Sequence, residues 1–131
     1  MLNIRKAAAT LGATALLATP IVALSATPAV AADRELRCHG AEVDFEVDKE
    51  RKGNRAGFEV DIDVDDARPG SKWRIKLRHD GKLVHSKVYT ADRDGEIDVN
   101  KWRKNTKGKD RFKAVVKPAG AKACTSVITR R

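Results

Sequence analysis

Two cysteines, three histidines and many carboxylates are the residues of this chain whose types could support chemistry. Cys38 and Cys124 lie far apart and lack a C-x-x-C spacing, which argues against a redox or metal-binding thiol pair. Only one pairing is possible, and the bridge would close a loop of nearly the whole domain. Such a loop is worth about 4–5 kcal/mol of stability in the chain-entropy model. We therefore expect a structural disulfide between them.

The other reactive residue types do not form a recognisable catalytic or metal motif. The histidines show neither i/i+4 nor H-x-H spacing: His39, His79 and His85. Residues 61–65 begin like a calcium loop, but Asp66 stands where the loop needs Gly, and Lys72 where it needs Glu. There is no G-x-S-x-G and no glycine-rich phosphate loop. The sequence predicts no enzyme, no metal site and no cofactor.

The first 32 residues have the three parts of a secretory signal peptide. Arg5 and Lys6 precede an uncharged run of Ala, Thr, Leu and Val that ends in small residues before Asp33. Cleavage after Ala31 and cleavage after Ala32 fit equally well. A permanent membrane anchor is the alternative, but prolines interrupt the run and its Ala and Thr content makes it only mildly hydrophobic. We expect a secreted, extracellular protein without a membrane anchor in its mature form.

Removal of this segment leaves residues 33–131 as a single domain. Of the 27 Lys and Arg residues two lie in the signal, so 25 remain against 18 Asp and Glu, a net charge of +7. The apolar residues of this part alternate with polar ones in nearly every segment, and none shows a helical stripe. Asp80-Gly81 is a strong hairpin signal. The pattern predicts an all-β domain of about seven antiparallel strands.

Seven short strands in about 100 residues resemble an immunoglobulin-like or fibronectin type III-like β-sandwich. Residues 89–99, Y-T-A-D-R-D-G-E-I-D-V, are similar to a stretch of many bacterial immunoglobulin-like modules, and Trp73 is similar to the core Trp of antibody domains. The Ala/Thr-rich signal resembles those of secreted actinobacterial proteins. The cysteines lie on the first and last strands, so the antibody-type bridge is absent, and the resemblance implies a fold and not a function.

Alternation also assigns charges to faces, because residues between inward apolar ones point outward. Three strands, the first, second and fifth, are expected to share a sheet with an acidic outer face, and the other sheet exposes cations. A two-residue turn at Asp80-Gly81 would pair Ile75 with Ser86, facing inward, and Arg74 with Lys87, facing outward. An alternative stays open: if the acidic second strand pairs with the basic third, the charges form salt-bridge ladders.

The densest cationic segment, residues 101–113, is predicted to be a loop that contains Trp102. Such a loop could bind phosphates or sulfates by ion pairing, with the indole available for stacking; alternatively Trp102 plugs the end of the sandwich.

The sequence thus favours a secreted, non-enzymatic binding module that engages an extracellular anionic partner, a polyanion or an acidic protein surface. The alternative is a structural secreted protein that self-associates through complementary charged faces. The candidate anion-binding residues are Lys72, Arg74, Lys76, Lys87, Lys101, Arg103, Lys104, Lys107 and Lys109.

Overall fold

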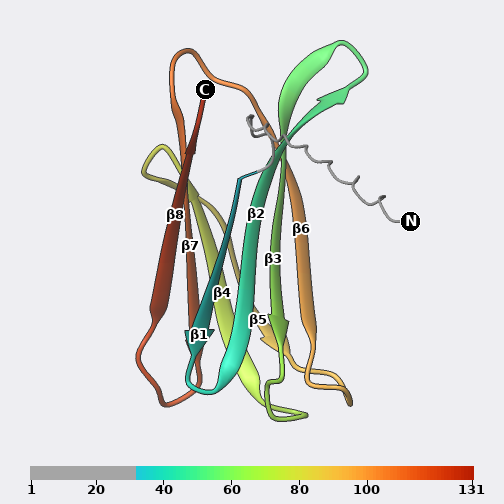
Figure 1. Ribbon diagram of the computed structural model, residues 1–131, viewed down its shortest axis with the longest axis vertical. Helices are drawn as coiled ribbons and strands as arrows, with labels where there is room; N and C mark the ends of the chain where they lie inside the picture. The colour runs from blue at the N-terminus through green and yellow to red at the C-terminus, as the bar shows by residue number, and fades with distance from the viewer. Residues whose placement is uncertain (1–31) are drawn as a thin grey trace, which may run out of the picture.

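The computed structural model describes residues 32–131, which form eight strands in two antiparallel four-stranded sheets (Figure 1). The strands are β1 (Ala32–Cys38), β2 (Ala41–Lys52), β3 (Arg55–Asp65), β4 (Lys72–His79), β5 (Lys82–Thr90), β6 (Ile97–Lys104), β7 (Asp110–Pro118) and β8 (Cys124–Arg130). One sheet has the order β1-β2-β3-β6 and the other β5-β4-β7-β8. The all-β prediction is confirmed. Within residues 32–131 there is no helix that could cross a membrane. The predicted signal peptide lies outside the described residues, apart from Ala32, which begins β1.

The two sheets bury an apolar layer between them. Every second residue is buried from Ala41 to Val47 of β2, from Phe58 to Val64 of β3 and from Trp73 to His79 of β4, and the residues between them are half-buried or exposed. The largest side chains without solvent contact come from both sheets, and include Phe45, Phe58 and Phe112. The rings of Phe58 and Phe112 meet edge to face across the layer, with centroids 5.4 Å apart. The period-two pattern therefore fixes which side chains must face water.

The strand order decides between the two charge arrangements left open by the sequence. The acidic strand β3 pairs with β2 and β6, whereas the basic strand β4 pairs with β5 and β7 in the other sheet. The three strands expected to share a sheet, here β2, β3 and β6, do so. The alternative prediction, a salt-bridge ladder between the acidic and basic strands, is therefore wrong, because these strands lie in different sheets.

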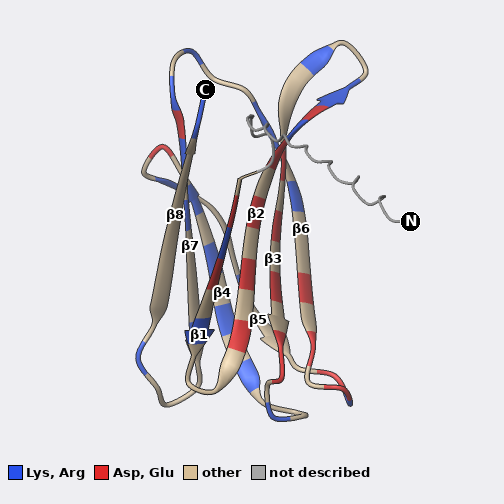
Figure 2. Ribbon diagram, viewed as in Figure 1, with Lys and Arg blue, Asp and Glu red and all other residues tan. Residues whose placement is uncertain are grey.

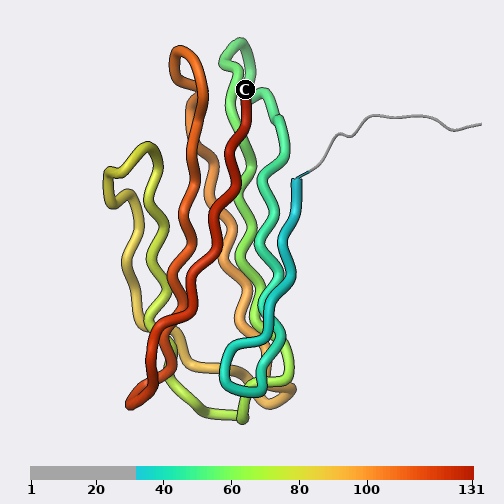
Figure 3. Tube along the Cα trace, turned by 60° about the vertical axis from the view of Figure 1, so that its left-hand side comes forward, coloured from blue at the N-terminus to red at the C-terminus, as the bar shows by residue number. Residues whose placement is uncertain are grey.

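The β4–β5 hairpin departs from its expected register. A β-bulge between Leu77 and Arg78 adds one residue to β5, so Ile75 lies opposite Lys87 rather than Ser86. A shift of one residue turns each following side chain to the other face. The predictions that Ser86 and Val88 face inward and that Lys87 faces outward are wrong for this reason. Figure 3 shows β5 at the free edge of its sheet.

Two further boundaries differ from the sequence expectation. Strand β1 was not predicted, because its apolar content is low and Arg34 lies on the core side, opposite Phe45. Strand β6 continues to Lys104, so the first four residues of the predicted cationic loop are strand. Its register against β3 sets Lys101 opposite Val60, on the inner side of the sheet.

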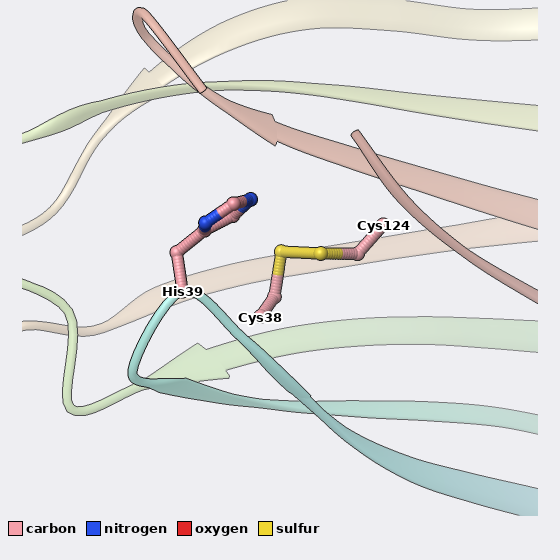
Figure 4. Close-up of side chains that lie close together, drawn as sticks. All are labelled: Cys38, His39 and Cys124. Atoms are coloured by element: carbon pink, nitrogen blue, oxygen red, sulfur yellow. A yellow bond between two sulfur atoms is a disulfide. The ribbon is translucent and has the colours of Figure 1, made fainter. Parts of the chain in front are cut away.

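The predicted disulfide is confirmed. Cys38, at the end of β1, is bonded to Cys124, at the start of β8, with Cα atoms 5.9 Å apart (Figure 4). These are outer strands of different sheets, and β1 contacts β8 along the same side of the molecule. The bridge therefore ties the two sheets together at the side away from β5 and β6.

Replacement of both cysteines by Ala should lower the free energy of unfolding by about 4–5 kcal/mol, because the unfolded chain regains the entropy of an 86-residue separation. Urea unfolding of the variant and of the oxidised protein measures the difference. Reduced wild-type protein is the matched control, since it lacks the bridge but keeps both sulfurs. A loss below about 1 kcal/mol would contradict this role.

Candidate functional site

The outer surface of the β1-β2-β3-β6 sheet carries mainly carboxylates. We call this surface the acidic face; it comprises Asp33, Glu35, Glu42, Asp44, Glu46, Asp48, Glu59, Asp61, Asp63, Asp65 and Asp98. In Figure 2 acidic residues recur along β2 and β3, at every second position. None of these carboxylates forms a salt bridge with a cation of residues 32–131.

Like charges lie directly opposite one another on the acidic face. One row crosses all four strands, through Glu35, Asp44, Asp63 and Asp98. Burial, a hydrogen bond with Asp98 and the neighbouring carboxylates raise the pKa of Asp63 to about 7. The pKa of Glu35 is also raised, mainly by the charge of Asp44. This row places repelling carboxylates side by side without a counter-charge.

The outer surface of the second sheet has the opposite sign. We call it the basic face; it comprises Lys72, Arg74, Lys76 and Arg78 of β4 and Arg111, Lys113 and Lys117 of β7. In Figure 2 the charged residues of β4 are all blue, that is, Lys or Arg. Arg74 lies opposite Lys117, and Arg78 opposite Lys113, so cations also face each other across strands. The charged residues of the basic face are therefore all cations, whereas those of the opposite outer surface are mainly carboxylates, with a few cations such as Arg37, which lies opposite Glu42.

A hollow of about 460 Å³ lies on the basic face, lined by Lys72, Arg74, Val88, Lys117 and Ala119. The Lys72 ammonium donates to Thr90 Oγ1 (3.3 Å) and the Arg74 guanidinium to Ser86 Oγ (3.1 Å). These neutral partners position the cations without cancelling their charge. The side chain of Val88 is 44 % exposed at the same place. The hollow thus combines three cations with an apolar floor, a chemistry suited to an anion with an uncharged body.

The structure divides the nine predicted anion-binding residues among three places. It brings Lys72, Arg74 and Lys76 together on the basic face, as expected. The bulge removes Lys87 from that face and places it on the inner side of its sheet. Lys101 and Arg103 of β6 also lie on the inner side of their sheet. The remaining three lie on the outer side of β6 or in the loop at the end of the sandwich: Lys104, Lys107 and Lys109.

Trp102 neither plugs the end of the sandwich nor offers a bare stacking surface. It lies on the outer side of its sheet, over Gly57, where an added Cβ would overlap the indole ring. Its Nε1 donates to the Glu50 carbonyl (3.1 Å), and the cations of Lys52 and Arg55 lie 5.6 and 5.0 Å from the ring centroid. The residue covers the hairpin formed by β2 and β3.

The candidate anion-binding residues chosen from the sequence leave out four members of the basic face: Arg78, Arg111, Lys113 and Lys117. The pattern was available for them. Arg111, Lys113 and Lys117 alternate with Phe112, Ala114 and Val116 in the sequence. What could not be seen was that β7 lies beside β4, which joins the two rows of cations into one surface.

Each histidine already has a hydrogen-bond partner. His39 bonds to the Lys122 carbonyl (2.8 Å) and His85 to the Tyr89 hydroxyl (2.7 Å). Buried His79 bonds to buried Asp110 through Nε2 (2.6 Å), and its Nδ1 accepts from Arg103 Nε (3.2 Å). A catalytic triad requires a hydrogen bond between a nucleophile and a histidine. Among residues 32–131 no Ser, Thr or Cys side chain forms such a bond.

Three groups of side chains have the composition of metal sites. In the group of Cys38, Cys124 and His39, both sulfurs form the disulfide (Figure 4). In the group of His79, Asp80 and Asp110, both ring nitrogens of the histidine are already hydrogen-bonded. In the third group, carboxylate oxygens of Glu42, Asp44 and Asp65 lie within 4.8 Å of one another on the acidic face. The donors of the third group alone are open, and they are oxygens of the kind that hard cations prefer.

Comparison with known proteins gives no relative: no family model, no curated protein and no solved structure matches the chain.

Replacement of Asp63 by Asn should stabilise the protein by about 0.5–1 kcal/mol at pH 8 and low salt, because it removes repulsion from the carboxylates on both neighbouring strands. The folded-state pKa of Asp63, about 7, exceeds the ordinary value of 3.8. The carboxylate therefore destabilises the fold above pH 7, and this effect is lost as the pH falls toward 4. Urea unfolding of the wild type and the Asp63→Asn variant from pH 4 to 8 measures the gain in stability and its dependence on pH.

Glu50→Gln is the control, since Glu50 lies opposite Gly57 rather than a carboxylate. An Asp63→Asn gain that is the same at pH 4 and pH 8, or one that Glu50→Gln reproduces, would contradict repulsion within the row.

Proposed function

We propose that this protein is a secreted, non-enzymatic binding module whose basic face engages an extracellular polyanion. The observation that carries the proposal is the unpaired row of cations that β4 and β7 present together. Side chains at every second residue of a strand recur about every 6.7 Å, so a linear polymer laid along β4 would meet four cations. An acidic protein surface is the other partner of suitable charge.

The separation of the two faces supports binding in spite of the carboxylates. The Debye length at physiological salt is about 8 Å, and packed sheets lie about 10 Å apart. A polymer on the basic face would therefore experience its cations largely screened from the acidic face. The intramolecular disulfide is compatible with the oxidising environment outside the cell.

We also propose that the fold is an immunoglobulin-like or fibronectin type III-like sandwich with one added strand. The support is the arrangement of β2–β8, in which a three-stranded unit β2-β3-β6 faces the sheet β5-β4-β7-β8, and β1 extends the first unit at its edge. Trp73, on β4, which is the third of the strands β2–β8 in chain order, is buried in the core. Such sandwiches have many functions, so the charges carry the functional proposal.

The mature protein should be retained on immobilised dextran sulfate and should elute as salt rises, because binding releases counterions. Replacing Lys72, Arg74 and Lys117 by Gln should flatten the dependence of log K on log salt by about two to three. The matched control replaces Lys104, Lys107 and Lys109, which changes net charge equally but leaves the basic face intact. Equal losses for both variants, or elution in the void volume at low salt, would contradict the proposal.

The opposed faces also support a second candidate, a structural protein in which the acidic face of one copy stacks on the basic face of the next. Such a contact is head-to-tail and does not close, so it would build chains rather than dimers. Sedimentation at rising protein concentration should then show oligomers that dissociate in high salt. A monomer at all concentrations in low salt would rule this candidate out.

A further inference from the structure

The edge strand β5 carries polar side chains where a sandwich normally carries apolar ones. His85, Lys87 and Tyr89 lie opposite the buried residues Leu77, Ile75 and Trp73 of β4, on the inner side of the sheet. Val88, by contrast, faces outward and is 44 % exposed. The bulge in the hairpin produces this inversion, and bulges of this kind are found where a strand must present a particular side chain.

The edge strand of the other sheet carries cations on the same side of the molecule. Lys101 and Arg103 of β6 lie opposite buried Val60 and Phe58 of β3, so they too are on the inner side. Arg103 is held by His79, which is itself fixed by Asp110 and by stacking on Phe112 with ring centroids 4.3 Å apart. The five residues His85, Lys87, Tyr89, Lys101 and Arg103 form what we call the edge cluster.

The charges of the edge cluster act on one another across the two sheets. Burial lowers the pKa of His85, and the charges of Lys101 from β6 and Lys87 from β5 lower it further. The Lys87 ammonium lies 5.1 Å from the ring centroid of Tyr89, and His85 bonds to the Tyr89 hydroxyl. Within residues 32–131, none of the three cations of the cluster forms a salt bridge.

We propose that the edge cluster binds a compact oxyanion, phosphate or sulfate, either free or as the ester group of a small ligand. Lys87 of β5 and Lys101 of β6 act on His85 from the two sheets, and Arg103 lies two residues beyond Lys101 on the same side of β6. A tetrahedral anion offers such donors oxygens that point in several directions. A bound anion would also relieve the repulsion among the cations. The site is distinct from the basic face and does not depend on the polyanion proposal, since its side chains lie on the inner side of the sheet edges.

The experiment follows the ring protons of His85 by NMR while inorganic phosphate or glucose 6-phosphate is added at ionic strength held constant with chloride. Saturable shifts of the His85 signals are expected, with a rise in the His85 pKa, because the anion offsets the charges of Lys101 and Lys87. Inorganic phosphate as the tighter probe would assign a free ion, and the sugar phosphate as the tighter probe would assign an ester.

Replacing Lys87 and Lys101 by Gln should weaken binding by about three- to tenfold per residue. The conservative Lys101→Arg variant keeps the charge and should bind within about threefold of the wild type, which separates loss of charge from loss of folding. The triple variant of the basic face, at Lys72, Arg74 and Lys117, should keep phosphate binding while it loses dextran sulfate. His85 signals that respond to phosphate no more than to chloride, or a double variant that titrates like the wild type, would overturn the proposal.

Discussion

The apolar layer between the two sheets is the constraint on which the rest of this structure depends. It takes every second side chain of the central strands, and these include Phe45, Ile62 and Leu77, which are fully buried. A chain in which about a third of the residues are charged can then place its charges only on the outer surfaces or at the sheet edges. Strand pairing determines the rest, because strands that share a sheet also share an outer face. The separation of charge by sign is thus a consequence of topology and not of local sequence alone.

This separation costs stability, and the protein accepts the cost on both faces. Carboxylates stand opposite carboxylates in the row through Asp63, and Arg74 stands opposite Lys117. Pairs of this kind destabilise a sheet by a few tenths of a kcal/mol to about 1 kcal/mol each. The disulfide between Cys38 and Cys124 acts in the other direction, by restricting the unfolded chain. A domain that maximised stability would alternate its charges, and the proposed binding of a charged partner would account for these rows of like charge.

Local patterns predicted much of the fold and of the basic face. Alternation located most of the strands, and it assigned Lys72, Arg74 and Lys76 to one surface correctly. The sequence could not show that β7 would lie beside β4, which depends on contacts between distant segments. It also could not show the bulge at Leu77, because the hydrophobic pattern of β5 favours the register without a bulge. Strand β1 escaped because its core side carries Arg34 and its apolar content is small.

The inverted strand β5 is where sequence and structure disagree most, and the disagreement has a physical explanation. An edge strand is paired on one side only, so its inner side chains lie at the margin of the apolar layer. Lys87 and His85 can therefore occupy core-side positions without complete loss of solvent, and Val88 can face outward at modest cost. On the opposite side of the molecule the disulfide holds β1 and β8 together, whereas the side with β5 and β6 has no such link. The molecule thus has one covalently fastened edge and one cationic edge, and the cationic edge is the one that a small anion would bridge.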